Sequence, residues 1–209
     1  MASRRGRFYD SISDFIVSFS LFTAIGWKLN QNYNSIWVWI ICYTALIASM
    51  LQCSFFIYYE VAFIKQTGKD TINRLLEAVT EEDLKKEDKF TILLQRIFQV
   101  LYGWQDYLVY KIDKFSLSIV ERQMTSSNKS KIHSHKSGIA DVWYKDKSFL
   151  SLSSLLCIGT HMVLIALFAV IGKFEYYLIL NLILLNLLLI SAVFYHYFHT
   201  LSVLKPGKN

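Results

Sequence analysis

The chain has 209 residues, of which 54% are hydrophobic and only 18% are charged, and its formal net charge is +6. About a quarter of the residues of a soluble domain are charged, so this composition disfavours a soluble globular protein and indicates a membrane protein. Pro206, the single proline, lies almost at the C-terminus, which favours long uninterrupted helices over a loop-rich fold.

Four apolar segments are long enough to cross a bilayer core, which needs roughly 20 helical residues. The first is residues 12–29, after a basic leader of residues 1–11. Ser11 and Asp14 have the spacing of a capping box, which would place Asp14 in the first turn of this helix. A cleaved signal peptide is the alternative, but no small-x-small cleavage site follows the segment. A retained span is therefore favoured.

The second segment, residues 36–64, is long enough to tilt or to project beyond the bilayer. Trp37 and Trp39 lie near its start, and Tyr58 and Tyr59 lie near its end. Aromatic residues gather at the two membrane–water boundaries, so this placement is typical of a transmembrane helix.

A polar segment, residues 65–147, follows the second span, and we expect two helical parts in it. Residues 70–88 are highly charged, and Thr80 and Asp83 have the spacing of a second capping box. Residues 90–120 carry apolar side chains at steps of three or four, which predicts one amphipathic helix. The interaction stripe that we expect on this helix consists of Leu94, Ile97, Leu101, Trp104 and Leu108.

Three positions remain open for the amphipathic helix. The alternatives are a helix along the membrane surface, a helix in a cytoplasmic bundle, and an oligomeric coiled coil. A fifth span over residues 90–110 is disfavoured, because Arg96, Asp106 and several glutamines are costly in a bilayer.

The remainder of the chain contains the last two spans. Residues 125–140 are rich in serine and lysine without periodicity, and we expect a flexible loop there. The third span is predicted at residues 148–171 and the fourth at residues 176–204, with a short tail over residues 205–209.

Short turns within each pair of spans predict two antiparallel hairpins. Of the 22 lysines and arginines, 20 fall in the leader, the polar segment and the tail, and only Lys28 and Lys173 fall in the turns. Positive residues favour the cytoplasmic side, so both termini and the polar segment are expected in the cytoplasm. The predicted fold is all-α, with four transmembrane helices as two hairpins joined by a cytoplasmic helical segment.

Polar residues inside the apolar segments are the intramembrane candidates. His161 lies in the third span, Asn181 and Asn186 in the fourth, and Glu60 toward the cytoplasmic end of the second. Ionisable groups within a membrane are functional candidates, whereas the asparagines are expected to form interhelical hydrogen bonds. The plain alternative for His161 is a neutral, hydrogen-bonded imidazole, and the alternative for Glu60 is a position at the membrane boundary.

Small residues indicate where helices approach closely. Ala45, Ser49 and Cys53 recur every fourth residue on the second span, and Ser20 and Ala24 are the corresponding pair on the first. We interpret both sets as helix-packing positions.

Cofactor sites are not predicted. The three cysteines, Cys42, Cys53 and Cys157, form no Cys-x-x-Cys pair, which disfavours a zinc site and a disulfide framework. A metal site formed by His133, His135, His196 and His199 is disfavoured against exposed or boundary histidines. Lys129, Lys131 and Lys136 lack interleaved aromatic residues, so lipid headgroups are preferred over nucleic acid as their contact.

The sequence contains no Walker A loop, no G-x-G-x-x-G, no G-x-S-x-G and no H-E-x-x-H motif. We therefore expect a non-enzymatic membrane accessory or assembly protein, which binds a protein partner or associates with itself. An oligomeric pore or channel subunit is the alternative, and a membrane-shaping hairpin protein is the second alternative. A bacterial inner membrane and the endoplasmic reticulum fit equally well.

Overall fold

The computed structural model describes residues 3–69, 73–127 and 132–204, with the side chains of all of them except residues 125–127 and 132–137. The described residues form helices and turns and contain no β-strand. Four helical runs are long and apolar enough to cross a membrane: Arg4–Tyr33, Ile36–Gln66, Gly138–Ile171 and Phe174–Leu204. The all-α class and the number of candidate spans agree with the sequence.

The first two candidate spans are α1, Arg4–Tyr33, and α2, Ile36–Gln66. Ser3 caps α1 by accepting a hydrogen bond from the backbone N–H of Gly6. The basic leader is therefore helical, and the predicted capping box of Ser11 and Asp14 is wrong, because Asp14 lies well inside α1. No proline follows Ser3 within this stretch, so the helix continues through the leader and past Ser11.

The other two candidate spans contain irregular turns. The third is divided into α7, Lys147–Ser153, and α8, Ile158–Ile171, by a 3₁₀ turn and an extended Cys157. The fourth begins as α9, Phe174–Ile179, and continues through a π-helical turn, Leu180–Leu185, into α10, Asn186–Leu204. The sequence predicted both segments but neither interruption.

The segment between α2 and α7 is largely helical. It contains α3, Glu81–Lys86; α4, Lys89–Phe98; a π-helical turn, Gln99–Gly103; α5, Trp104–Ser127; and α6, Ile132–Tyr144. The capping box of Thr80 and Asp83 is confirmed at the start of α3. The loop expected over residues 125–140 is wrong, because α5 and α6 cover it except at residues 128–131, which lie outside the described residues.

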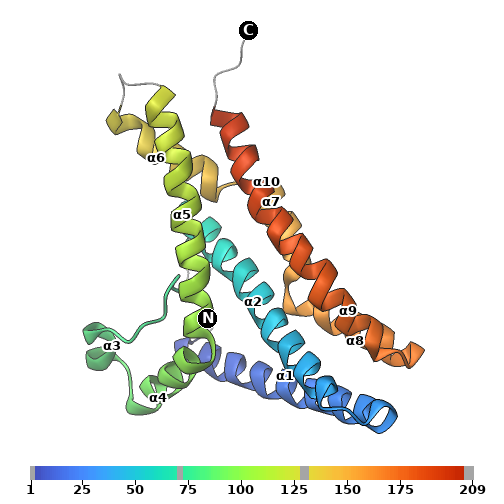
Figure 1. Cartoon of the computed structure of the whole chain (residues 1–209). Helices are drawn as coiled ribbons and strands as arrows, with labels where there is room; N and C mark the ends of the chain where they lie inside the picture. The colour runs from blue at the N-terminus through green and yellow to red at the C-terminus, as the bar shows by residue number, and fades with distance from the viewer. Residues whose placement is uncertain (1–2, 70–72, 128–131, 205–209) are drawn as a thin grey trace.

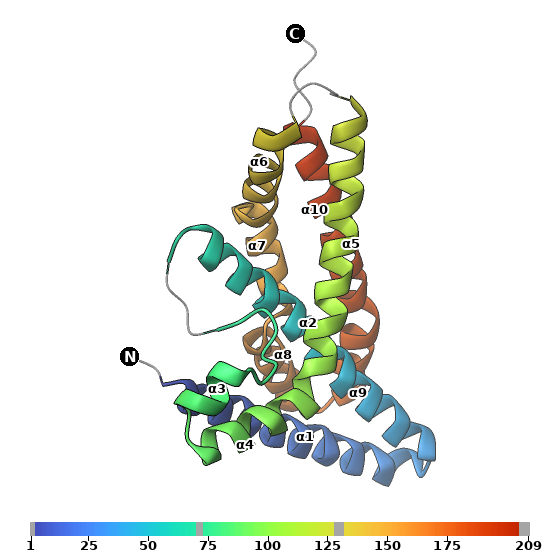
Figure 2. The same cartoon turned by 90° about the vertical axis from the view of Figure 1, so that its left-hand side faces the viewer.

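Helices far apart in the sequence lie side by side. Figure 1 shows α4 alongside the N-terminal half of α1, and α5 rising from this point across α2. Figure 2 shows the far half of α5 next to α10 and α6. Three apolar clusters result: one among α1, α2, α8 and α9, one around Phe55 and Phe149, and one around Val120 and Trp143.

The contact between α1 and α2 depends on the absence of a side chain at Gly26. A Cβ atom there would lie 3.0 Å from two ring carbons of Trp39. We therefore expect Gly26→Leu to lower the free energy of unfolding by about 1–3 kcal/mol through overpacking. Ala24→Leu is the control, because Ala24 lies two residues away on the exposed side of α1. Thermal unfolding in detergent measures both, and equal stability of the two variants would contradict this packing.

Candidate functional site

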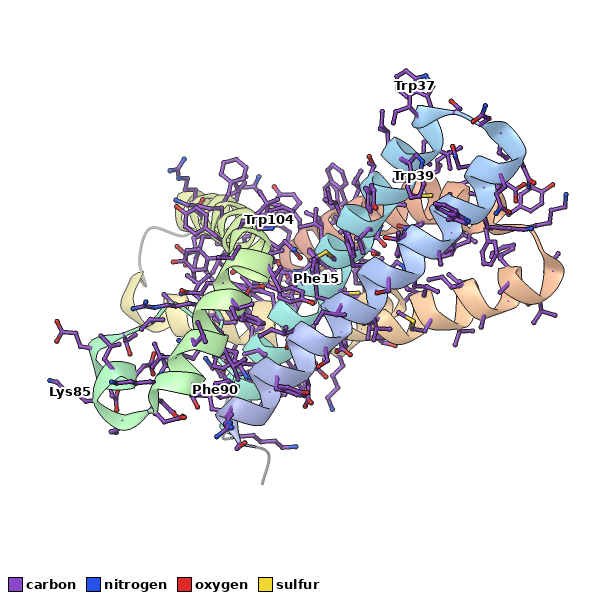
Figure 3. The ribbon with its side chains drawn as sticks, turned by 90° about the horizontal axis from the view of Figure 1, so that it is seen from below. Phe15, Trp37, Trp39, Lys85, Phe90 and Trp104 are labelled. Atoms are coloured by element: carbon purple, nitrogen blue, oxygen red, sulfur yellow. The ribbon has the colours of Figure 1, made fainter. Side chains whose placement is uncertain are left out.

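The interaction stripe predicted on residues 90–120 divides between the two sides of its helix. Leu94 is buried and Leu101 is half-buried, whereas Ile97, Trp104 and Leu108 are exposed. Val100 and Phe115 extend the exposed part, and Val100 is 78% exposed. We call Ile97, Val100, Trp104, Leu108 and Phe115 the α4–α5 face. Figure 3 shows Trp104 on α5, far from Trp37 and Trp39 near the turn between α1 and α2.

The opposite side of these helices is attached to the candidate spans by polar contacts. Ser54 Oγ of α2 donates to Gln105 Oε1 of α5 over 2.8 Å. Tyr102 OH donates to the carbonyl oxygen of Ser11 on α1 over 3.0 Å. Gln95 and Gln105 therefore lie on the inner side of these helices, and both are 0% exposed.

Asp113 joins three helices through one buried carboxylate. Its two oxygens accept hydrogen bonds from Tyr58 OH at 2.9 Å, Trp143 Nε1 at 2.8 Å and Tyr144 OH at 2.7 Å. The side chain is 0% exposed, and three donors are what a buried carboxylate requires. The sequence did not identify this group, because its donors come from α2 and α6.

The C-terminal histidines have structural partners. His196 is buried, contrary to the expectation of an exposed or boundary residue. It stacks between the rings of Trp143 and Phe149, with centroid distances of 3.8 and 3.9 Å, and its Nε2 lies 2.8 Å from the carbonyl oxygen of Trp143. His199 Nδ1 lies 2.7 Å from Asp146 Oδ2.

An ion cluster attaches the start of α1 to the segment before α4. Arg7 pairs with Glu77 at 2.7 Å, Arg4 contacts both Glu77 and Asp83, and Arg74 pairs with Asp83 at 2.9 Å. Burial alone would raise the pKa of Asp83, but hydrogen bonds from Arg4 and Arg74 hold that pKa well below its usual range. The leader arginines are therefore structural partners as well as positive charges.

The asparagines of the fourth candidate span form a buried hydrogen-bond network. Asn181 Nδ2 donates to the carbonyl oxygen of Ala45 at 2.9 Å, and Gln52 Nε2 donates to Asn186 Oδ1 at 3.1 Å and to the Asn181 backbone oxygen at 3.3 Å. The π-helical turn at Leu180–Leu185 contains this backbone oxygen, and π turns commonly leave carbonyl groups for other donors. Tyr177 OH extends the network to within 3.2 Å of His161 Nδ1.

The small residues behave differently on the two helices. Ala45 and Ser49 are buried on α2 and Cys53 is half-buried, as a packing face requires. Ser20 and Ala24 are exposed on α1, so the expected packing role is wrong for contacts among the described residues. Sequence spacing identifies such a pair but does not say which side of a helix meets its neighbours.

A cavity of about 310 Å³ lies among α1, α2, α8 and the segment around Glu77. His161 and Glu60, two of the intramembrane candidates, line it, together with Asp14 and Asp106. Burial raises the pKa of Asp106 to about 7; Glu77 adds to this rise and Arg7 opposes it. We call this space the α1–α2–α8 cavity.

No metal centre is present among the residues that the structure describes, since no group of three or more His, Cys, Asp or Glu side chains has the required arrangement. The side chains of His133, His135 and Lys136, and residues Lys129, Lys131 and 205–209, lie outside the described part. Comparison of the chain with protein-family models, curated proteins and solved structures gives no match.

The buried network predicts a stability cost for removing Asn181. Asn181→Leu should lower the free energy of unfolding by about 1–2 kcal/mol, because Tyr177 OH and Gln52 each lose a partner in apolar surroundings. Asn186→Leu is the comparison, and it should cost less because Asn186 is only half-buried. Thermal unfolding in detergent measures both. Wild-type stability of Asn181→Leu would show that the network does not hold α2 against the π-helical turn Leu180–Leu185.

Proposed function

We propose that this chain is a non-enzymatic, multi-pass membrane accessory or assembly protein that holds a protein partner on the α4–α5 face. The observation that carries this proposal is the contrast between the two sides of one helix. The inner side is attached to the spans by Gln105 and Asp113, while the outer side exposes Trp104, Leu108 and other apolar groups. Exposed apolar surface on a fixed support is typical of an interaction site.

The depth of this face favours a partner that is itself at the membrane. Ser54, which contacts Gln105, is the nineteenth residue of the 31-residue α2. Gln105 therefore lies beside a part of α2 that still belongs to the second span. Trp104 is the neighbour of Gln105 on α5, and tryptophan favours the boundary between headgroups and hydrocarbon. We infer that the partner contacts the protein at the cytoplasmic boundary of the bilayer.

In this proposal both termini and the segment between the hairpins lie on the cytoplasmic side, with the start of α5 at the boundary of the bilayer, and the four spans form two transmembrane hairpins. The distribution of 20 of 22 lysines and arginines supports it. The hydrogen bonds of Asn181 and Asn186 within the chain support a packing role over the alternative role of lining an oligomeric pore.

The orientation is tested by cysteine labelling in intact cells or sealed vesicles. Gln31→Cys and Lys173→Cys, near the two short turns, should react with a membrane-impermeant maleimide added outside, and Lys69→Cys should react only after permeabilisation. The native cysteines are buried or half-buried and provide the background measurement. Labelling of Lys69→Cys from outside would overturn the orientation, and unreactive turns would favour a membrane-inserted wedge over crossing hairpins.

The partner surface is tested by photo-crosslinking in cells. A benzophenone amino acid at Val100 should give a discrete protein adduct, whereas the same group at Val170, which is 90% exposed on α8, should not. Trp104→Asp in the Val100 variant should abolish the adduct, because a carboxylate is costly in an apolar contact. Adducts with lipid alone at Val100 would mean that the bilayer covers the α4–α5 face and that the proposed partner site is wrong.

A further inference from the structure

The outer side of α4 combines apolar side chains with positive charge. Phe90 is 43% exposed and Leu93 is 52% exposed, and Lys89 and Arg96 are exposed beside them. Residues 89, 93 and 96 are separated by steps of four and three, so they lie on one side of the helix. The ten residues of α4 include no Asp and no Glu. The helix therefore presents a surface that is apolar and positively charged.

Arg5 of α1 extends this positive charge across the ring of Phe90. Its guanidinium lies 4.6 Å from the ring centre, and Figure 3 shows Phe90 beside the first turns of α1. Stacking on a ring leaves the N–H edge of a guanidinium free to bind an oxyanion. Arg5, Lys89 and Arg96 form no ion pair among the described residues, whereas the arginines of the ion cluster are all engaged. Asp88, which precedes α4, is occupied as the N-cap of that helix.

The inner side of α4 is polar, which is the reverse of a helix on the surface of a soluble protein. Gln95 is 0% exposed, and its Nε2 donates to the backbone oxygen of Glu77 over 3.0 Å and to Asp83 Oδ2 over 3.2 Å. The polar side chains of α4 are thus used inside the protein, and its apolar side chains face outward. Contact of apolar groups with water is unfavourable, so the outer side is suited to hydrocarbon.

The position of α4 places this outer side at a bilayer surface. α4 packs along the N-terminal half of the candidate span α1, where the rings of Phe8 and Phe98 are 5.4 Å apart. Apart from Lys28, the charged residues of α1 all precede residue 15. The charged start of α1 and the helix beside it therefore lie at the level of the headgroups. Basic side chains at this level reach headgroup phosphates while their apolar neighbours enter the hydrocarbon.

We propose that the outer side of α4 docks on a bilayer surface that contains anionic phospholipid, with Arg5, Lys89 and Arg96 at headgroup phosphates and with Phe90 and Leu93 against acyl chains. We call these five residues the α4 basic patch. Charge complementarity selects anionic over zwitterionic lipid, because basic side chains near a membrane are attracted to a negative surface. The patch shares no residue with the α4–α5 face, so this inference does not rest on the proposed protein partner.

Photo-crosslinking in vesicles of defined composition tests the patch. A benzophenone amino acid replaces Leu93 in the full-length protein, which is reconstituted with equal amounts of phosphatidylglycerol and phosphatidylcholine of the same acyl chains. Mass spectrometry of the lipid adducts should show phosphatidylglycerol enriched by at least about threefold. The same group at Val163, which is 67% exposed on α8, is the matched control and should give adducts in the proportion of the two lipids.

Charge variants in the Leu93 background separate the patch from the overall charge of the protein. R5Q/K89Q/R96Q should abolish the enrichment, and it should remain folded because these cations form no ion pair among the described residues. A second triple variant removes the same amount of charge from exposed lysines elsewhere and should retain the enrichment; it is K28Q/K147Q/K173Q.

Two buffers of equal ionic strength distinguish a lipid headgroup from a free anion. Chloride and inorganic phosphate should lower the enrichment equally, since both act by screening. Loss of the enrichment in phosphate alone would assign the basic side chains to a soluble anion and overturn the proposal. Equal lipid proportions at Leu93 and Val163, protein adducts alone at Leu93, or unchanged enrichment in a folded R5Q/K89Q/R96Q variant would also overturn it.

Discussion

The structure depends on satisfying polar groups that have no access to water. Asp113 shows this most clearly, because an unpaired buried carboxylate costs several kcal/mol, and here it accepts three hydrogen bonds. Its donors come from α2 and α6, so the carboxylate fixes α5 against both. The stacked His196 connects the same cluster to α10. One buried carboxylate thus joins α2, α5 and α6, and the stacked imidazole adds α10 to the same cluster.

The same constraint explains the unusual division of α4 and α5 into two sides. In a soluble bundle, the apolar stripe of a helix faces the core and the polar side faces water. Here Gln95, Gln105 and Asp113 face inward and form hydrogen bonds with other helices or with the segment before α3, while Trp104 and Phe115 face outward. Lipid tails do not drive apolar side chains inward, so polar contacts can hold helices together while apolar groups remain outside.

The sequence was sufficient for the spans because length and hydropathy are local properties. The capping box at Thr80 is local in the same sense, and it was also predictable. The inner and outer sides of α5 could not be predicted in this way. Apolar periodicity shows where a stripe lies on a helix, but not whether that stripe faces protein, lipid or water. Ser20 and Ala24 are exposed among the described residues for a related reason: small residues permit the close approach of another helix without requiring it. Gln52, Asp113 and the cavity required partners at long sequence separation, for which a single sequence contains no signal.

The α4–α5 face and the α1–α2–α8 cavity lie on opposite sides of one short stretch at the start of α5. Trp104 and Asp106 are two residues apart, which in an α-helix means that their side chains point about 200° apart. A protein bound at Trp104 therefore does not contact the cavity that Asp106 lines. Between the two sides, Tyr102 donates to the carbonyl oxygen of Ser11 on α1, and Gln105 accepts from Ser54 on α2. These two hydrogen bonds hold this stretch against both spans, so its apolar side is a fixed surface.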